Sequence, residues 1–157
     1  MYDFYTIHTN SNVDSSTTQG NNYTTFLFNT IENIVQVSVV FFSFHGNVST
    51  SNICYLCVDE LVSPYNYLTG TPASNTAATY NPSSAGLAEH PIGIFEVKSG
   101  RTVYQQNDYS TQTQFPEPIG SLDRLRIRLR NADGDLIDLI DQNVYITFRF
   151  TCAKKTS

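Results

Sequence analysis

The segment 122–139 has the sequence "LDRLRIRLRNADGDLIDL", and apolar residues alternate with arginines over its positions 124–130. The apolar positions of the alternation are Leu125, Ile127 and Leu129. The positions around them are Arg124, Arg126, Arg128 and Arg130. Successive side chains of a β-strand point to opposite faces, whereas this spacing on a helix would spread the arginines around the axis. The alternation therefore predicts a half-buried strand with one apolar face and one arginine face.

The "NADGD" stretch that follows predicts a hairpin turn into a second strand at 136–140. Asp-Gly is a strong hairpin signal, because Gly134 adopts positive φ without steric cost. Oxygen ligands at Asn131, Asp133 and Asp135 resemble the start of a calcium loop of the EF-hand type. That loop places Gly sixth and Glu twelfth, whereas Gly134 is fourth here and the twelfth residue is a glutamine. A plain turn is the favoured interpretation.

Similar apolar patterns recur along the chain and indicate strands rather than helices. The expected strands are 4–9, 23–29, 34–44, 53–59, 92–98, 102–106 or 111–115, 125–131, 136–140 and 144–152. Eight or nine strands without helices between them are typical of a sandwich or a barrel. With 157 residues, we expect one all-β domain spanning 1–157.

Two polar segments interrupt this pattern, at about 10–22 and 62–91. The second is rich in Ser, Thr, Asn, Pro and Ala, and a loop of that length in a compact domain is usually functional. Its tyrosines are candidate contact residues, because Tyr combines an apolar ring with a polar hydroxyl. These loop residues are Tyr65, Tyr67 and Tyr80. A tolerated surface insertion is the alternative.

Composition and charge narrow the functional classes. An apolar fraction of 40%, with ten Phe and ten Tyr, is enough for a packed core. The net charge of −5 argues against capture of nucleic acid by the whole molecule. The arginine face keeps three interpretations: a solvated structural face, a subunit interface that pairs with carboxylates, or a local phosphate contact. Asp135, Asp138 and Asp141 lie across the predicted hairpin and are expected to pair with part of its charge.

The chain shows no recognisable chemistry of its own. Its three cysteines include Cys54-x-x-Cys57, but positions three apart on a strand face opposite sides, so buried thiols are favoured over zinc. No hydrolase elbow, zinc-protease, phosphate-loop or dinucleotide motif occurs. We therefore expect no enzyme activity and no cofactor.

The start of the chain does not resemble a secretory signal, and the longest apolar run, "VSVVFFSF", is too short to span a membrane. Synthesis in a cytosol is expected.

Two segments resemble a known family. They are "FLFNTIENIVQVSVVFFSF" (26–44), with a short "IENIV" turn between two strands, and "PIGSLDRLRIRLRNADGDLIDL" (118–139), followed by the strand "NVYITFRF". Together they resemble single jelly-roll capsid proteins of double-stranded DNA viruses. The particular group is the penton (vertex) and minor capsid proteins of virophages, polinton-like viruses and nucleocytoplasmic large DNA viruses.

The resemblance implies an eight-stranded jelly-roll sandwich of two antiparallel sheets, located in the virion. It further implies a homopentamer at the capsid vertex that contacts major capsid proteins. The expected subunit interface is formed by Arg124, Arg126, Arg128 and Arg130. Many penton proteins of this group carry an additional outer domain, whereas 157 residues have room for the jelly roll alone. A minor or cement capsid role, or a fragment of a longer protein, therefore stays open. A separate alternative is a jelly-roll binding module, such as a trimeric receptor- or glycan-binding head.

Overall fold

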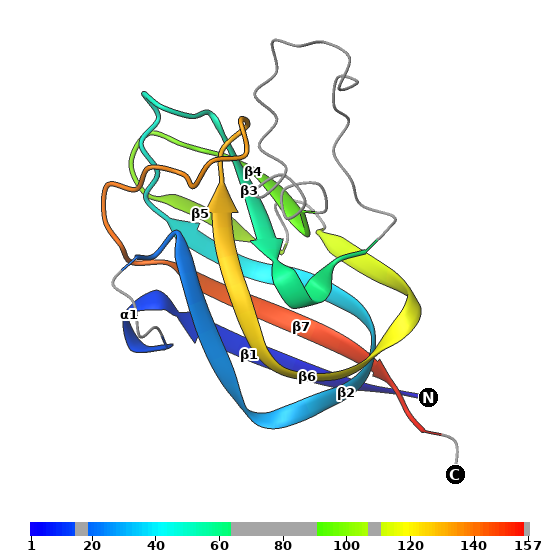
Figure 1. Cartoon of the computed structure of the whole chain (residues 1–157). Coiled ribbons are helices and arrows are strands. Elements are labelled where there is room, and N and C mark those ends of the chain that lie inside the picture. Colours follow the sequence, from blue (N-terminus) through cyan, green and yellow to red (C-terminus); the bar gives the residue numbers. More distant parts are fainter. Residues whose placement is uncertain (15–18, 64–90, 107–110, 156–157) are drawn as a thin grey trace.

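Figure 1 shows a computed structural model of the chain, which describes residues 1–14, 19–63, 91–106 and 111–155. In chain order, its elements are β1 (Tyr2–Asn10), α1 (Ser11–Asp14), β2 (Asn22–Phe44), β3 (Ile53–Val58), η1 (Asp59–Leu61), β4 (Gly93–Glu96), β5 (Thr102–Gln105), β6 (Gln112–Arg130) and β7 (Tyr145–Ala153). The fold is all-β, as the sequence predicts. Tyr65, Tyr67 and Tyr80 lie outside the described residues.

The described strands form one antiparallel sheet in the order β1-β7-β2-β6-β3-β4, with β5 added alongside β2. The sheet curls so that its two halves face each other (Figure 1), an arrangement consistent with a jelly-roll sandwich. In the first layer, residues 34–44 of β2 pair with β7 and β5, and β1 pairs with β7. In the second layer, residues 22–31 of β2 pair with β6, and β3 joins β6 to β4.

β2 and β6 each run through both layers, which corrects two expected breaks in the strand pattern. The segments 23–29 and 34–44 belong to one strand, and the expected "IENIV" turn is a bend within it. The backbone turns there at Asn33, whose φ is 55°. The alternative strands 102–106 and 111–115 both exist, the first as β5 and the second as the start of β6. The described residues therefore contain seven long or short strands rather than eight or nine separate ones.

The core lies between the layers and takes its side chains from both. Leu125, Ile127 and Leu129 of β6 are fully buried, so the predicted apolar face is confirmed. Aromatic rings join the two layers: Phe42 of β2 meets Phe95 of β4 edge-on, with 4.7 Å between ring centroids. An edge-to-face contact between aromatic rings adds to the stability that burial provides.

The predicted turn after β6 is confirmed, but the predicted strand at 136–140 is wrong. Gly134 has a φ of 87°, and Asn131 accepts hydrogen bonds through Oδ1 from the N–H groups of Asp133 (2.9 Å) and Asp135 (3.1 Å). Beyond the turn, Leu136 bridges to β6 and Leu139 bridges to Gly46. The segment keeps the alternation of a strand, but it crosses between the layers instead of following one partner.

Candidate contact surfaces

The arginine row of β6 is graded from exposed to buried. Arg124 and Arg126 are exposed, Arg128 is half-buried, and Arg130 is only 6% exposed. All four occupy the face of β6 opposite the core leucines, as the alternation predicts. The gradient arises because β3 and η1 pack beside the second half of the row and leave the first half uncovered. Within the row, only Arg124 and Arg126 are available to another molecule.

Acidic residues around η1 hold the middle of the row. Arg128 donates from Nη1 to Oδ1 of Asp59 at 2.7 Å, and both side chains are largely buried. The backbone N–H of Arg126 donates to Oε2 of Glu60 at 2.8 Å. Asp59 and Glu60 follow β3 directly, so the strand pairing of β3 with β6 brings them into reach. Charge-assisted contacts of this length are stronger than neutral hydrogen bonds.

The expected partners of the row were Asp135, Asp138 and Asp141, and the structure gives a different pairing. Asp141 contacts Arg101 at 3.3 Å, and the Arg128 partner is Asp59. The reason is that residues 136–140 do not continue as a strand paired with β6. They cross toward β2 and place the later aspartates there. Arg130 donates from Nη1 to the carbonyl oxygen of Gly134 at 2.5 Å, and its buried Nε has no partner within the described residues.

Exposed aromatic rings gather at one end of the sandwich, which we call the corner end (residues 1–5, 26–33 and 152–155). Phe26 is 69% exposed and Phe28 fully exposed, and Tyr2 and Phe4 are 57% and 67% exposed. A shallow depression at this end is lined by residues of β1, the β2 bend and the C-terminal end of β7. Exposed large apolar residues are candidates for contact with another molecule.

A bulge in β2 contains Phe28 and directly follows Phe26. Between the pairs Phe26–Arg124 and Ile31–Leu122, β2 has four residues against the single Asp123 of β6. A bulge of this kind leaves its extra residues unpaired and bends the strand. Phe26 lies directly across from Arg124, so aromatic and cationic side chains share this part of the surface. The sequence carries no signal for this site, because the pattern "FLFNT" continues the alternation of a paired strand.

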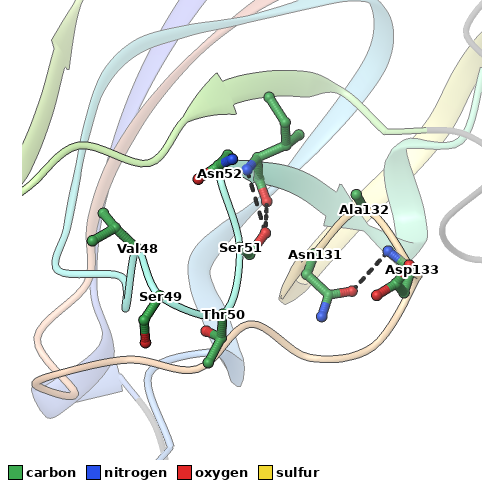
Figure 2. Close-up of a pocket in the computed structure, with 9 residues that line it drawn as sticks. Val48, Ser49, Thr50, Ser51, Asn52, Asn131, Ala132 and Asp133 are labelled. Carbon is green, nitrogen blue, oxygen red and sulfur yellow. Dashed lines mark hydrogen bonds between the residues drawn. The ribbon is translucent and has the colours of Figure 1, made fainter.

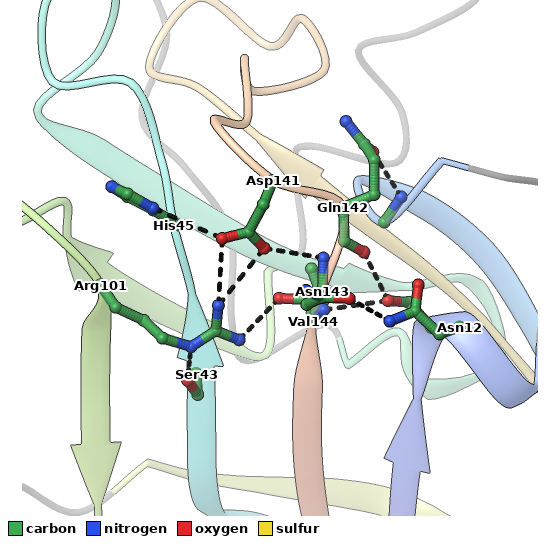
Figure 3. A network of polar contacts seen from close by, with 10 residues as sticks. Asn12, Ser43, His45, Arg101, Asp141, Gln142, Asn143 and Val144 are labelled. Carbon is green, nitrogen blue, oxygen red and sulfur yellow. Dashed lines mark hydrogen bonds and ion pairs between the residues drawn. The ribbon is translucent and has the colours of Figure 1, made fainter.

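Polar contacts gather at the opposite end, which we call the loop end (residues 19–21, 45–52, 97–101 and 131–144). Figure 3 shows Arg101 at its centre, donating from Nε to Ser43 Oγ at 2.8 Å and from Nη2 to the carbonyl oxygen of Asn143 at 2.7 Å. The Arg101 guanidinium also lies over the Tyr145 ring, 5.3 Å from its centroid. These contacts tie β5 to β2 and to the start of β7.

Asp141 completes this network. Burial alone would raise the pKa of its carboxyl, but the Asn143 N–H and the Arg101 guanidinium outweigh burial and lower that pKa below its usual value. His45 Nδ1 lies 3.4 Å from Asp141 Oδ2, so Ser43, His45 and Asp141 have the residue types of a hydrolase triad. However, the Ser43 hydroxyl oxygen accepts from Arg101, and Figure 3 shows the other ring nitrogen of His45 directed away from it. A triad requires that nitrogen to bind the serine hydroxyl.

A shallow open depression of about 400 Å³ also lies at the loop end, between residues 48–53 and 131–133 (Figure 2). Its polar side chains are mostly engaged with nearby backbone: Ser51 Oγ donates to the carbonyl oxygen of Ile53 at 2.6 Å, and Asn131 holds the turn. The lining contains no aromatic ring on which a sugar would stack. The depression is a by-product of two packed loops.

The three cysteines are buried free thiols, as predicted. Cys54 belongs to the core, whereas Cys57 lies on the arginine face beside Arg128. Burial raises the pKa of the Cys57 thiol to about 12. The thiolate is the nucleophilic and metal-binding form of cysteine, so this thiol is unreactive at neutral pH. Within the described residues, no helix has the length and apolar character needed to cross a membrane.

No protein-family model matches the chain, and no curated protein matches it. Among solved structures, the chain is similar to the crystal structure of the infectious bursal disease virus VP2 subviral particle, with 17% identity and a TM-score of 0.29. The match covers 96% of this chain and 32% of that chain, so this chain spans about a third of the length of the structure. A likeness at this TM-score is too distant to assign a function.

Proposed function

We propose that the chain is a structural virion protein, a penton subunit that forms a homopentamer and contacts neighbouring major capsid proteins. The observation that carries the proposal is the combination of exposed phenylalanines on β2 and exposed arginines on its neighbouring strand β6. The resemblance of 26–44 and 118–139 to single jelly-roll capsid proteins supports the particular role at the vertex. A capsid subunit needs a rigid framework whose surface is buried against neighbours, and the curled sheet provides such a framework.

The exposed phenylalanines supply an apolar centre for a contact. Phe26 and Phe28 project from strand β2, whose flanking residues are held by β6. Fully burying one phenylalanine side chain contributes about 1.5–3 kcal/mol. Since these rings are already held on a strand, less conformational entropy is lost when a partner covers them than on a mobile loop.

Charges on the same molecule complement each other in a way that suits head-to-tail assembly. Arg124 and Arg126 are exposed on β6, and Asp133 and Asp135 are exposed on the turn that follows it. About 20 Å of strand separates the two groups, estimated from the usual rise per residue. A closed ring requires contacts between two different patches of each subunit. The arginines of one copy facing the aspartates of the next would provide such a contact.

Native mass spectrometry across a concentration and salt series tests the proposal. We expect a pentamer that dissociates as salt screens the charged contact. A trimer would contradict the vertex role and favour a receptor-binding head. A species that stays at one copy in all conditions would remove the support for self-assembly and leave a minor or cement role.

A charge-reversal series tests the contact itself. Arg124→Glu with Arg126→Glu should abolish the pentamer, and adding Asp133→Lys with Asp135→Lys should restore it. Arg128 is left intact because Asp59 binds it within the fold. Arg149→Glu is the matched control, since Arg149 is an exposed arginine on β7, in the other layer. An unchanged pentamer in the double variant at every ionic strength would show that the arginine face is not the interface.

A further inference from the structure

Apart from β1, the edges of the curled sheet within the described residues carry protection against pairing with another strand. The edge of β6 that precedes its pairing with β3 contains Pro116 and Pro118, which cannot donate to a neighbouring strand. The edge of β4 is capped by Tyr104, whose hydroxyl accepts from the N–H of Glu96 at 3.0 Å and donates to its carbonyl oxygen at 3.1 Å. The edge formed by residues 22–31 of β2 is interrupted by the bulge at 27–30. The edge strand β5 has only four residues. Capping, bulges and shortness are the usual means by which edges avoid association.

The remaining edge, β1, has none of these protections. β1 pairs with β7 over nine consecutive residues without a register shift. Its sequence, "YDFYTIHTN", contains no Pro, Gly or Lys and is rich in residues that favour strands. An exposed edge that is long, regular and partly apolar is a template for another strand.

The hydrogen bonds to β7 show which backbone groups of β1 face outward. Lys154 N–H donates to Met1 O, and Ser11 N–H donates to Val144 O. In an antiparallel pair, bonded positions alternate with non-bonded ones, so the odd-numbered residues of β1 bond to β7. The N–H and C=O groups of Tyr2, Phe4, Thr6 and His8 therefore point away from the sheet. No hydrogen bond within the described part of the chain reaches these backbone groups.

The side chains on this edge suit contact with an identical strand. Tyr2 and Phe4 are exposed on the same face as Thr6. The single acidic residue of β1, Asp3, points to the other face and is paired with Lys154 at 3.2 Å. The edge therefore carries no uncompensated acidic charge, and two copies can approach here although each has a net charge of −5.

We propose that β1 binds β1 of a second copy in antiparallel orientation, about a twofold axis at Thr6. Thr6 is the centre of the strand and one of the outward-bonding residues. The register centred on Thr6 places Phe4 opposite the second copy's His8, and Thr6 opposite Thr6. Outward-bonding residues then meet each other along the strand, and the first layers of two copies join into one sheet, β7-β1-β1-β7.

This contact goes beyond the proposed ring. A twofold contact uses the same patch on both copies, whereas a ring uses two different patches. The β1 edge belongs to the first layer and the arginine pair to the second, so both contacts can form on one subunit. The β1 contact joins copies in pairs, whether or not they also form rings.

The position of Thr6 on the axis gives a direct test. Thr6→Lys places two lysines opposite each other, and Thr6→Glu places two glutamates there; like charges directly opposite in a pair of strands are destabilising. We expect each variant alone to pair at least about tenfold more weakly than the unchanged chain. An equal mixture should form a one-to-one heterodimer by native mass spectrometry, because lysine then faces glutamate.

Thr30→Lys and Thr30→Glu are the matched controls, since Thr30 is also an exposed threonine but lies on the β2 bulge. Thermal melting checks folding, which the exposed side chain of Thr6 should leave unchanged. The proposal is overturned if the unchanged chain never forms a dimer or if Thr6→Lys forms a dimer as readily as the unchanged chain. It is also overturned if the mixture of Thr6→Lys and Thr6→Glu forms no heterodimer. Arg124→Glu with Arg126→Glu separates the two contacts, because it should remove the ring and leave the pair.

Discussion

At the loop end, Arg101 alone contacts the side chains of Ser43 and Asp141 and the backbone of Asn143, whereas at the corner end Phe28 is fully exposed. Both ends are built on the same two long strands, β2 and β6. The loop end has closely fitted polar groups around the chain crossings, and the corner end has a bulge and exposed apolar rings. The polar groups of the loop end bind one another, whereas the apolar rings of the corner end face solvent. This difference suggests that the loop end stabilises the fold and that the corner end contacts other molecules.

The largest difference between the ends should come from a pair of glycine substitutions. A Cβ at Gly20 would lie 2.3 Å from the carbonyl oxygen of Gln142, whereas a Cβ at Gly120 would meet nothing within 4 Å. We expect Gly20→Ala to lower the free energy of unfolding by about 2 kcal/mol, the usual cost of overpacking. Gly120→Ala, near the corner end, should be neutral or slightly stabilising. Urea unfolding of both variants measures the difference, and equal effects would contradict the comparison.

Removing one cation from each end should give the next largest difference. Arg101→Ala loses several hydrogen bonds and the contact with Tyr145, and we expect it to cost about 1–2 kcal/mol. Lys155→Ala at the corner end loses only an exposed ion pair with Glu32, which typically contributes below about 1 kcal/mol. Thermal unfolding at low and high salt measures both. If Lys155→Ala lowered the free energy of unfolding as much as Arg101→Ala does, the network around Arg101 would contribute no more to stability than an exposed ion pair.

Acid should affect the loop end through Asp141. Because the folded state lowers the pKa of this carboxyl, its stabilising effect is complete above the unfolded pKa and is lost as the pH falls through the folded pKa. Asp141→Asn should remove this component, so the variant should lose less stability than the unchanged chain below about pH 4. Because the carboxylate is partly exposed, we expect a difference below about 1 kcal/mol. Identical acid titrations of stability would contradict it.

The smallest effect on stability should come from Phe28→Ser at the corner end. The ring is fully exposed, so its removal should change the free energy of unfolding by less than about 0.5 kcal/mol. Its effect should appear instead in self-association, measured by sedimentation across a concentration series. Phe44→Ser provides the contrast, because Phe44 is fully buried and its replacement should destabilise the fold by several kcal/mol.

The alternation of the β6 sequence was sufficient to predict the two faces of that strand. It did not predict how deeply each arginine is buried, because burial depends on β3 and η1, which are far away in sequence. Arg130 lies beside Tyr55 of β3, and the turn after β6 also brings Gly134 O to its guanidinium. A period-two pattern specifies sides of a strand but not the neighbours that cover them.

Features that depend on pairing between distant segments had no signal in the sequence. The bulge at 27–30 exists because β6 offers only Asp123 at that point. The contact of Arg101 with Asp141 joins residues forty positions apart with no motif between them. Whether "YDFYTIHTN" is an edge or a central strand is decided by the order of strands in the sheet. The candidate surfaces are therefore consequences of topology more than of local composition.

The pairing of β1 with β7 also has a consequence during synthesis. Tyr2 pairs with Ala153, so β1 leaves the ribosome about 150 residues before its partner strand is complete. At roughly 5–20 residues per second, that interval is on the order of ten seconds. Throughout this time β1 exposes both of its edges, and neighbouring nascent chains on one messenger present the same strand. The yield of folded protein should therefore depend on how densely ribosomes are spaced as well as on the stability of the finished fold.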